Sequence, residues 1–306
     1  MFWDKWFEPK PYKSGYLPEK DGHQVYFEAF GNPQGKPVLL FHGGPGGSCR
    51  RYRAKYANLK KYQVIMFDQR GCGKSLPLGK IENNTTQDLL DDAVRLLNFL
   101  KINKKVILWG ASWGSTLALL WAEQNPEKTD KLLLSQIFLA NDDFHQWEIE
   151  GIRYIYPDFM EELEKISKGD IVNYFNRLIQ SNDKQKQLKA ANTYGWFERV
   201  CGSFAPQFAD FKELSEKELA SHRIYMHYAA HNLFLKENDI LKNINKINRV
   251  EALLIHNRLD LICPYKGAYD LHKALPKSRL ITVPDFGHVS KKLGKTIKKE
   301  IKAVLR

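Results

Sequence analysis

Six short apolar runs rich in Val, Ile and Leu recur along the chain, separated by segments long enough to form helices. The runs lack the alternation of a strand that faces water on one side, so each predicts a strand buried on both faces. Such strands, alternating with helices, form a parallel sheet with crossover helices. We therefore predict an α/β fold with a mostly parallel central sheet. Its predicted strands are Val38–Phe41, Val64–Phe67, Val106–Trp109, Leu132–Ile137, Ala252–His256 and Leu280–Val283.

The sequence between residues 141 and 246 differs in character from the segments on either side of it. It lacks comparable apolar runs and is dense in helix formers and aromatic residues, which predicts helices. The simplest organisation is one α/β domain that a helical insertion divides in sequence. Residues 1–140 and 247–306 would be its two parts, and residues 141–246 a helical cap domain.

The composition of the 306 residues, 43% hydrophobic and 27% charged, excludes a disordered chain and a collagen-like repeat. No window approaches the roughly 18 consecutive apolar residues of a membrane span, and the first residues do not follow the pattern of a signal peptide. The four cysteines are scattered without a CxxC pair, which favours reduced thiols. We expect a cytoplasmic protein without a membrane partner.

The net charge of +12 is concentrated at the end of the chain, where the last sixteen residues hold seven Lys or Arg against one Glu. Apolar residues recur there at helical spacing, which predicts an amphipathic helix docked on a core. A basic helix face is usually solvated, and no nucleic-acid motif accompanies it. We expect no nucleic-acid partner. The apolar positions are Leu293, Ile297, Ile301, Val304 and Leu305.

The strongest local signal is the pentapeptide Gly110–Gly114, which reads G-x-S-x-G between an apolar strand and a helix-forming stretch. In this context the pattern is typical of a nucleophile elbow, a sharp turn that exposes its serine at the end of a strand. A β-carbon at either glycine would collide with neighbouring backbone. We interpret Ser112 as a nucleophile; the alternative is an ordinary glycine-rich turn between strand and helix.

A serine nucleophile needs a general base and a carboxylate that orients this base. After an elbow of this kind, the acid and then the histidine follow in the chain, on loops beyond late strands. Asp260 and His288 fit this order, because each comes just past a predicted strand. Asp285, His256 and His272 are weaker candidates. Asp285 shares the loop of His288, and the two histidines fall at a strand end and in a helical stretch.

Two glycine-rich segments, HGGPGGS and DQRGCGKS, follow other predicted strands. In the first, backbone N–H groups can approach a developing oxyanion, with Gly44 and Trp113 as the two donors. Neither segment has the spacing of a phosphate-binding loop, so we interpret the second as a structural loop beside the active site. His227 and His231 have the spacing of metal ligands but lack a third ligand. We expect neither a metal nor a cofactor.

Together these motifs resemble those of the proline iminopeptidases, a family of the α/β-hydrolase superfamily. The resemblance runs through HGGPGG, DQRGCGKS, GASWGSTLALLWAEQNP, NRLDLICP and FGHVS, in both parts of the α/β domain. It implies the α/β-hydrolase fold with an inserted helical cap, a triad of Ser112, Asp260 and His288, and Gly44 in the oxyanion hole. It also implies release of an N-terminal residue, preferably proline, from peptides.

Within the cap, the family has a W-x-x-W-E segment, which resembles YGWFE at residues 194–198. The resemblance implies that Glu198 holds the amino terminus of the substrate. Tyr194 and Phe197 stand in place of the two tryptophans and would pack against the substrate. A second amine-binding glutamate of the family corresponds to Tyr225, so this chain departs from the pattern there.

These observations predict a serine hydrolase that acts by acyl transfer on a small peptide or on an amino-acid amide or ester. An unpaired buried ammonium is costly, so Tyr225 leaves open a carboxylesterase or amidase for uncharged acyl groups. A third reading is a non-catalytic binding protein on a hydrolase scaffold. The intact elbow, acid, histidine and glycine-rich loop argue against that reading.

Overall fold

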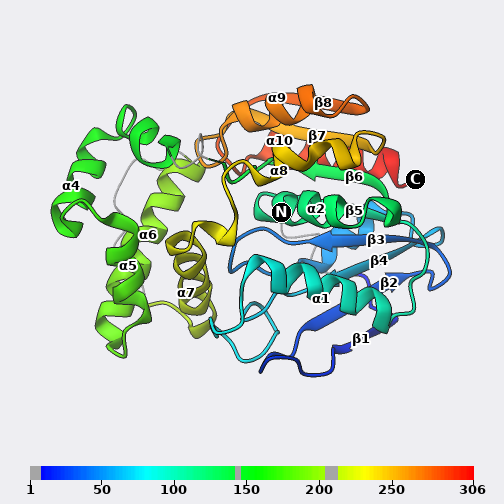
Figure 1. The fold of residues 1–306 in the computed structure, drawn as a ribbon, viewed down its shortest axis with the longest axis horizontal. Helices are drawn as coiled ribbons and strands as arrows, with labels where there is room; N and C mark the ends of the chain where they lie inside the picture. The colour runs from blue at the N-terminus through cyan, green and yellow to red at the C-terminus, as the bar shows by residue number, and fades with distance from the viewer. Residues whose placement is uncertain (1–7, 142–145, 204–212) are drawn as a thin grey trace.

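The computed structural model describes residues 8–141, 146–203 and 213–306, leaving aside the side chains of residues 148, 196–198 and 203. In the described part, an eight-stranded sheet runs through the main body with helices on both of its faces. A second group of helices lies beside one end of the sheet (Figure 1).

The sheet has the strand order β1-β2-β4-β3-β5-β6-β7-β8. β2 pairs antiparallel with β1 and β4, whereas the strands from β4 to β8 in this order pair in parallel. The carboxyl ends of the parallel strands therefore meet at one edge, where α/β proteins place functional groups. The strands are β1 Lys13–Tyr16, β2 Tyr26–Gly31, β3 Lys36–Phe41, β4 Tyr62–Phe67, β5 Val106–Ala111, β6 Thr129–Ser135, β7 Glu251–Leu259 and β8 Ser278–Phe286.

The predicted α/β fold with a mostly parallel sheet is confirmed, and each predicted run contributes to a strand. Two details of the prediction are wrong. β6 ends at Ser135 rather than Ile137, because Gln136 adopts a φ of 51°, outside the range of an extended strand. β8 is an edge strand with half-exposed side chains, so Leu280–Val283 is not buried on both faces. The apolar runs also did not reveal β1 and β2.

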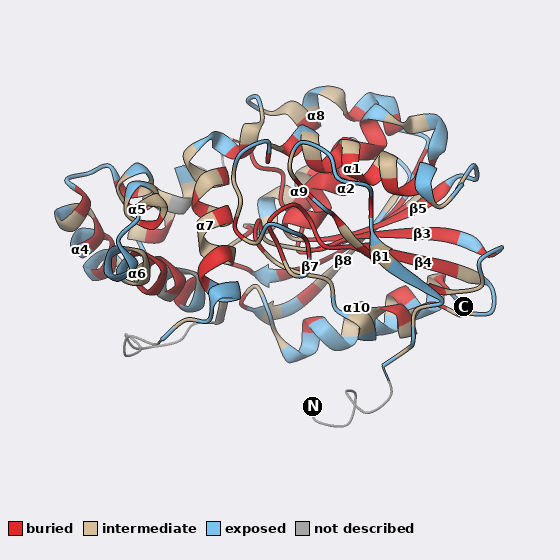
Figure 2. Cartoon of the chain, turned by 90° about the horizontal axis from the view of Figure 1, so that it is seen from below, coloured by how far each residue is buried: buried red, intermediate tan, exposed pale blue. Residues whose placement is uncertain are grey.

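Helices cover both faces of the sheet, and buried residues lie between the layers (Figure 2). α1, α2 and α9 pack on one face, and η2 and α10 pack on the other. α10 is the predicted amphipathic terminal helix, and it buries Leu293 and Ile301. Among the described residues, no helix has the length and apolarity needed to cross a bilayer. The bounds are η2 Arg51–Tyr56, α1 Thr86–Phe99, α2 Trp113–Gln124, η3 Pro126–Lys128, α9 Tyr265–Ala274 and α10 Lys291–Val304.

The second group of helices encloses a hydrophobic cluster of its own, with Phe159 and Phe175 almost fully buried in it. Helix α7 joins this cluster, here called the cap cluster, to the main body. Its Met226 packs in the cap cluster, whereas its Ile224 and Tyr228 belong to the core that also contains α2. After α7, the chain returns against α1 and α2. The bounds are η4 Trp147–Gly151, α4 Pro157–Ser167, α5 Ile171–Gln180, α6 Lys184–Ser203, α7 Glu216–Ala230, η5 Asn232–Phe234, α8 Asp239–Asn243 and η6 Ile244–Ile247.

Glu123, near the end of α2, is a carboxyl buried in the main body, with an exposed fraction of 5%. Its Oε1 atom has no hydrogen-bond partner among the described residues. Burial, reinforced by the nearby carboxylate of Asp239, raises the pKa of Glu123 from 4.5 to about 8. A carboxyl that binds its proton more tightly in the folded state stabilises the fold at low pH and loses this contribution as the pH rises.

We expect the Glu123 contribution to the free energy of unfolding to fall between pH 4.5 and about 8. One pKa unit corresponds to about 1.4 kcal/mol, so the loss should reach a few kcal/mol. Glu123→Gln removes this titration and should be more stable than the native chain at about pH 9, as measured by urea unfolding. Glu127→Gln, at an exposed position, is the control. Equal pH dependence in the native chain and Glu123→Gln would contradict the prediction.

Candidate active site

Ser112 lies in a sharp turn between the end of β5 and the start of α2. Its backbone angles, φ 56° and ψ −130°, are ones that residues with a β-carbon rarely adopt. A β-carbon on Gly110 would overlap the carbonyl oxygen of Gly114, and one on Gly114 would overlap that of Phe41 in β3. The predicted steric reason for both glycines is therefore present, and Ser112 lines a cavity.

Asp260 and His288 lie beside Ser112 at the carboxyl edge of the sheet, following the neighbouring strands β7 and β8. His288 Nε2 is 3.0 Å from Ser112 Oγ, and His288 Nδ1 is 2.8 Å from Asp260 Oδ2. Because an ionised carboxylate can only accept, Nδ1 carries the proton and Nε2 accepts from the serine hydroxyl. The structure thus brings the three predicted residues into one hydrogen-bonded chain.

The electrostatic environment keeps Asp260 ionised and makes His288 a stronger base. Burial acts to lower the pKa of His288, but the carboxylate of Asp260 and the side chain of Cys263 together outweigh it and raise this pKa well above its ordinary value. Burial acts to raise the pKa of Asp260, and the charge of His288 and its hydrogen bond reverse this, so the net shift is downward. The N–H groups of Ile262 and Cys263 also donate to Asp260 Oδ1, both at 3.0 Å, which favours the charged form.

The backbone of His288 is fixed by two hydrogen bonds that the sequence analysis did not predict. Its N–H donates to the carbonyl of Gly202 at the end of α6, at 2.8 Å. Its carbonyl accepts from Gln136 Nε2, at 2.6 Å. Gln136 follows β6, but the sequence analysis placed it inside the predicted strand Leu132–Ile137 and therefore missed its role. Groups from both the main body and the cap helices therefore fix the position of His288.

The weaker candidates for acid and base have other partners. His256 is buried in β7, where both ring nitrogens bond backbone groups. His272 bonds the hydroxyl of Ser278 in the main body. Asp285 lies on the edge strand β8, and its hydrogen bond to Ser290 lowers its pKa. None of these three contacts the Ser112 hydroxyl among the described interactions.

The HGGPGGS segment forms the loop after β3, and Gly44 in this loop lines the same cavity as Ser112 and His288. Trp113 is the first residue of α2, so its N–H has no acceptor within the helix. Backbone N–H groups at a helix start are suited to bind developing negative charge. The two predicted oxyanion donors therefore come from the loop after β3 and from the start of α2, which follows β5.

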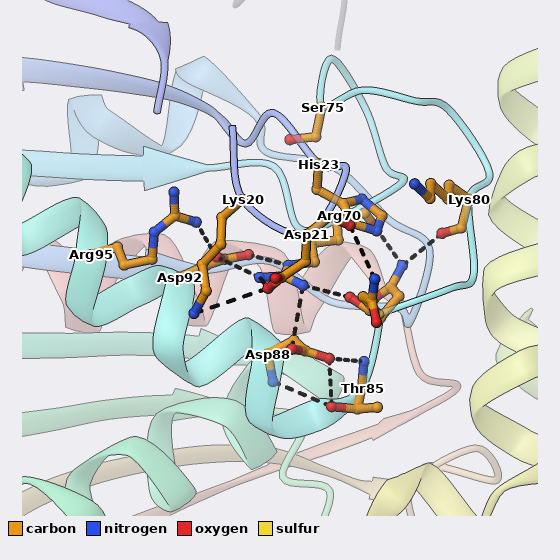
Figure 3. Close-up of polar contacts among 12 residues, drawn as sticks. Lys20, Asp21, His23, Arg70, Ser75, Lys80, Thr85, Asp88, Asp92 and Arg95 are labelled. Atoms are coloured by element: carbon orange, nitrogen blue, oxygen red, sulfur yellow. Dashed lines mark hydrogen bonds and ion pairs between the residues drawn. The ribbon is translucent and has the colours of Figure 1, made fainter. Parts of the chain in front are cut away.

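The DQRGCGKS segment forms the loop after β4, and a buried arginine fastens it to α1. Arg70 donates to both carboxylate oxygens of Asp92, at 2.7 and 3.0 Å. Asp88 and Asp21 also lie within 3.3 and 3.6 Å of its guanidinium (Figure 3). The arginine is thus surrounded by carboxylates, which compensates for the burial of its charge. This geometry fits the interpretation of the segment as a structural loop.

Helix α7 packs directly on both glycine-rich loops. A β-carbon on Gly46 would overlap the carbonyl oxygen of Ser221, and one on Gly71 would lie 2.8 Å from Ile224 Cδ1. These glycines therefore provide room for a cap helix to approach the loops beside the active site. The sequence contained the glycines but gave no signal of which helix would occupy the space.

A cavity of about 670 Å³ opens over Ser112 and His288, between the main body and the cap helices. Its wall is mostly apolar, with a few polar side chains, as expected of a small-molecule site. Arg199 and Cys263, which the sequence analysis did not assign to the site, also line it. The remaining lining residues are Gly44, Pro45, Phe138, Ile149, Ile152, Val172, Asn173, Gly202, Tyr225, Ala229, Ala230, Asn232, Leu233, Leu261, Ile262 and Val289.

The predicted substrate-binding residues fall into three groups. Tyr225 lines the cavity. Tyr194 is 3% exposed and packs against Tyr225, with the hydroxyl oxygens 3.4 Å apart and the ring centroids 5.2 Å apart. It is not among the cavity-lining residues, so it supports Tyr225 from the cap core. The side chains of Phe197 and Glu198 lie outside the described residues.

The histidine pair at the end of α7, His227 and His231, has structural partners. His227 Nε2 bonds the carbonyl of Asn84, and His231 Nδ1 bonds the carbonyl of His227. Within the described ranges there is no group of three or more His, Cys, Asp or Glu side chains suited to hold a metal ion.

Comparison with known proteins defines the class. The model of the alpha/beta hydrolase fold family matches residues 36–294. The proline iminopeptidase-related protein of Thermus thermophilus has a similar fold, with a TM-score of 0.61 at 20% identity over 96% of each chain. The chain is an α/β hydrolase.

Curated relatives define the family. The proline iminopeptidase of Xylella fastidiosa (strain Temecula1 / ATCC 700964) is 36% identical over 293 residues, covering 92% of each chain. That of Arabidopsis thaliana is 35% identical, covering 93% of this chain and 77% of its own length. This level of identity over nearly the whole chain places the protein in the proline iminopeptidase family. It is a serine hydrolase of the aminopeptidase type.

The close approach of backbone at Gly114 predicts that alanine destabilises this position but is tolerated at Gly294. Gly114→Ala would press a methyl group onto the Phe41 carbonyl, whereas Gly294, in α10, has open space around its α-carbon. We expect Gly114→Ala to lose about 3 kcal/mol of stability and most hydrolytic activity. Gly294→Ala should gain about 0.5–1 kcal/mol and keep its activity. Urea unfolding and ester hydrolysis measure both variants, and an active, stable Gly114→Ala would contradict the steric argument.

Proposed function

We propose that this protein releases an N-terminal residue, preferably proline, from small peptides by acyl transfer to Ser112. The hydrogen-bonded chain from Asp260 through His288 to Ser112, at the floor of an apolar cavity, is the observation that carries the proposal. A serine hydroxyl becomes a nucleophile when a base can take its proton and a carboxylate stabilises the resulting imidazolium.

In the proposed reaction, His288 Nε2 takes the hydroxyl proton while Ser112 Oγ forms a bond to the substrate carbonyl carbon. The tetrahedral oxyanion accepts hydrogen bonds from the N–H groups of Gly44 and Trp113. His288 then gives its proton to the leaving amine as the C–N bond breaks. Water, activated by the same histidine, hydrolyses the acyl-enzyme and releases the N-terminal residue. Asp260 remains ionised throughout, since its pKa is lowered.

The cavity supports a small apolar acyl group. Its volume of about 670 Å³ and its apolar wall suit a pyrrolidine ring. We propose that residues 141–246 form the cap domain between parts 1–140 and 247–306, and described residues of this range, such as Ile152 and Tyr225, line the cavity. We propose that Glu198 binds the substrate amine, that Tyr225 supplies a phenolic oxygen acceptor, and that Phe197 packs on the ring. Tyr194 contributes by supporting Tyr225. The relatives named proline iminopeptidases support this specificity.

The position of Tyr225 favours a second candidate, a carboxylesterase or amidase for uncharged acyl groups. The phenol lines the cavity where the family resemblance implies a second carboxylate for the substrate amine. A phenol offers an acceptor without charge, so a neutral acyl group would lose less binding energy there than an ammonium.

We also propose that the protein acts in the cytoplasm. All four cysteines are free thiols, which supports a reducing compartment.

The substrate class is tested with proline β-naphthylamide, its N-acetylated form and a short-chain p-nitrophenyl ester. We expect cleavage of the free-amine compound and none of the acetylated one, and Ser112→Ala should abolish turnover. Tyr225→Glu should lower KM for the free-amine compound by about tenfold, the effect of about 1.4 kcal/mol. Ester cleavage without amide turnover would favour the second candidate, and substantial activity in Ser112→Ala would rule out this nucleophile.

The pH profile tests the roles of Asp260 and His288. Because the carboxylate raises the pKa of His288, and the base acts in its neutral form, kcat/KM should fall as the pH drops through that raised pKa. Asp260→Asn should lower kcat about 10³–10⁴-fold and move this acid limb to lower pH. Asp285→Asn, on the neighbouring strand β8, is the control and should change neither. If the acid limb of Asp260→Asn lies at the same pH as that of the native enzyme, the role assigned to Asp260 is contradicted.

A further inference from the structure

Gln69 lies between the two segments that carry the proposed oxyanion donors. It follows β4, and β3 separates β4 from β5 in the sheet. Gln69 therefore reaches across the end of β3 to contact α2, which begins after β5. The residue is 2% exposed and is not among the residues lining the cavity, so it does not contact a substrate there.

The buried side chain of Gln69 joins the two donor segments by hydrogen bonds. Its Oε1 accepts from Trp113 Nε1, at 3.1 Å. Its Nε2 donates to the carbonyl of His42, at 3.0 Å, and its backbone N–H donates to His42 Nε2, also at 3.0 Å. One glutamine thus bonds the residue after Ser112 and a residue two before Gly44.

His42 continues this path to the oxyanion loop. Because its Nε2 accepts from Gln69, its proton lies on Nδ1, which donates to the carbonyl of Gly43 at 2.8 Å. Burial lowers the pKa of His42, which keeps the ring in the neutral form that this pattern requires. A continuous series of buried hydrogen bonds therefore runs from Trp113 to the residue before Gly44.

We propose that Gln69 and His42 are positioning residues that set the separation of the two oxyanion donors. This inference rests on the proposed acyl-transfer function at Ser112. Two donors stabilise a tetrahedral oxyanion only when both point at the same atom, and they belong to loops that follow different strands. The sheet fixes the strands, and the Gln69–His42 bonds fix the loops beyond the strand ends. Loss of the bonds should therefore weaken transition-state binding more than substrate binding.

The first test is Gln69→Met, which keeps the length of the side chain and removes its hydrogen bonds. On the best substrate of the native enzyme, we expect kcat to fall about 10–100-fold, part of the effect of losing one oxyanion donor, with KM within about threefold. Inhibition by a boronic-acid analogue of the same acyl group, which mimics the tetrahedral state, should weaken in parallel with kcat. Inhibition by the free acid product should not change.

Gln63→Met is the matched control, because Gln63 is an equally buried glutamine on β4 whose side chain bonds Tyr12, at the opposite end of that strand. It should lose stability without this change in kcat. If Gln69→Met does not fold, Gln69→Glu is tested instead. An ionised glutamate still accepts a hydrogen bond from Trp113 Nε1, but it cannot donate one to the His42 carbonyl. A raised KM with unchanged kcat in either Gln69 variant would overturn the proposal.

A double-mutant cycle tests the route through Trp113. Trp113→Phe removes the indole donor to Gln69 and keeps the backbone N–H of residue 113. If the two residues act through their hydrogen bond, Gln69→Met with Trp113→Phe should lose no more kcat than the larger single loss. Multiplicative losses would overturn the coupling. The native enzyme and Ser112→Ala are assayed in parallel, so a failure of the proposed function would show there and not in the cycle.

Discussion

The close approach of backbone at the Ser112 turn is the constraint on which the rest of the site depends. The first turn of α2 lies so near β3 that no side chain fits at Gly114, and the end of β5 lies so near α2 that none fits at Gly110. This contact places Ser112 in a strained conformation and aims it at the cavity. It also puts the start of α2 beside the loop after β3, so both proposed oxyanion donors meet at one point.

The loops that surround this turn are fixed by buried polar groups rather than by apolar packing alone. Arg70 fastens the loop after β4 to α1 through Asp92, and Gln69 fastens it to the loop after β3 and to α2. Buried ion pairs add little net stability because desolvation offsets their attraction. We therefore interpret these groups as determinants of position: each fixes a loop at the carboxyl edge of the sheet, where catalysis needs defined distances.

The cap takes part in the same arrangement. α7 contacts the loops after β3 and β4 at Gly46 and Gly71, and the end of α6 accepts a hydrogen bond from the backbone of His288. The cavity is therefore bounded by elements that also hold the catalytic loops. Gly202, at the end of α6, thus lines the cavity and also holds the backbone of His288.

The sequence by itself determined most of the strands of the parallel sheet, the helical segment inserted between β6 and β7, and the candidates Ser112, Asp260 and His288. These follow from local patterns: continuous apolar runs, the G-x-S-x-G turn, and polar residues just past strand ends. The predicted strand extended past Ser135, because the positive φ of Gln136 has no local signature. Only the tertiary structure decided that Tyr225 faces the cavity while Tyr194 packs behind it, and that Gln69 bonds both oxyanion segments. Those outcomes depend on which segments, distant in sequence, share one edge of the sheet, and no local pattern encodes that contact.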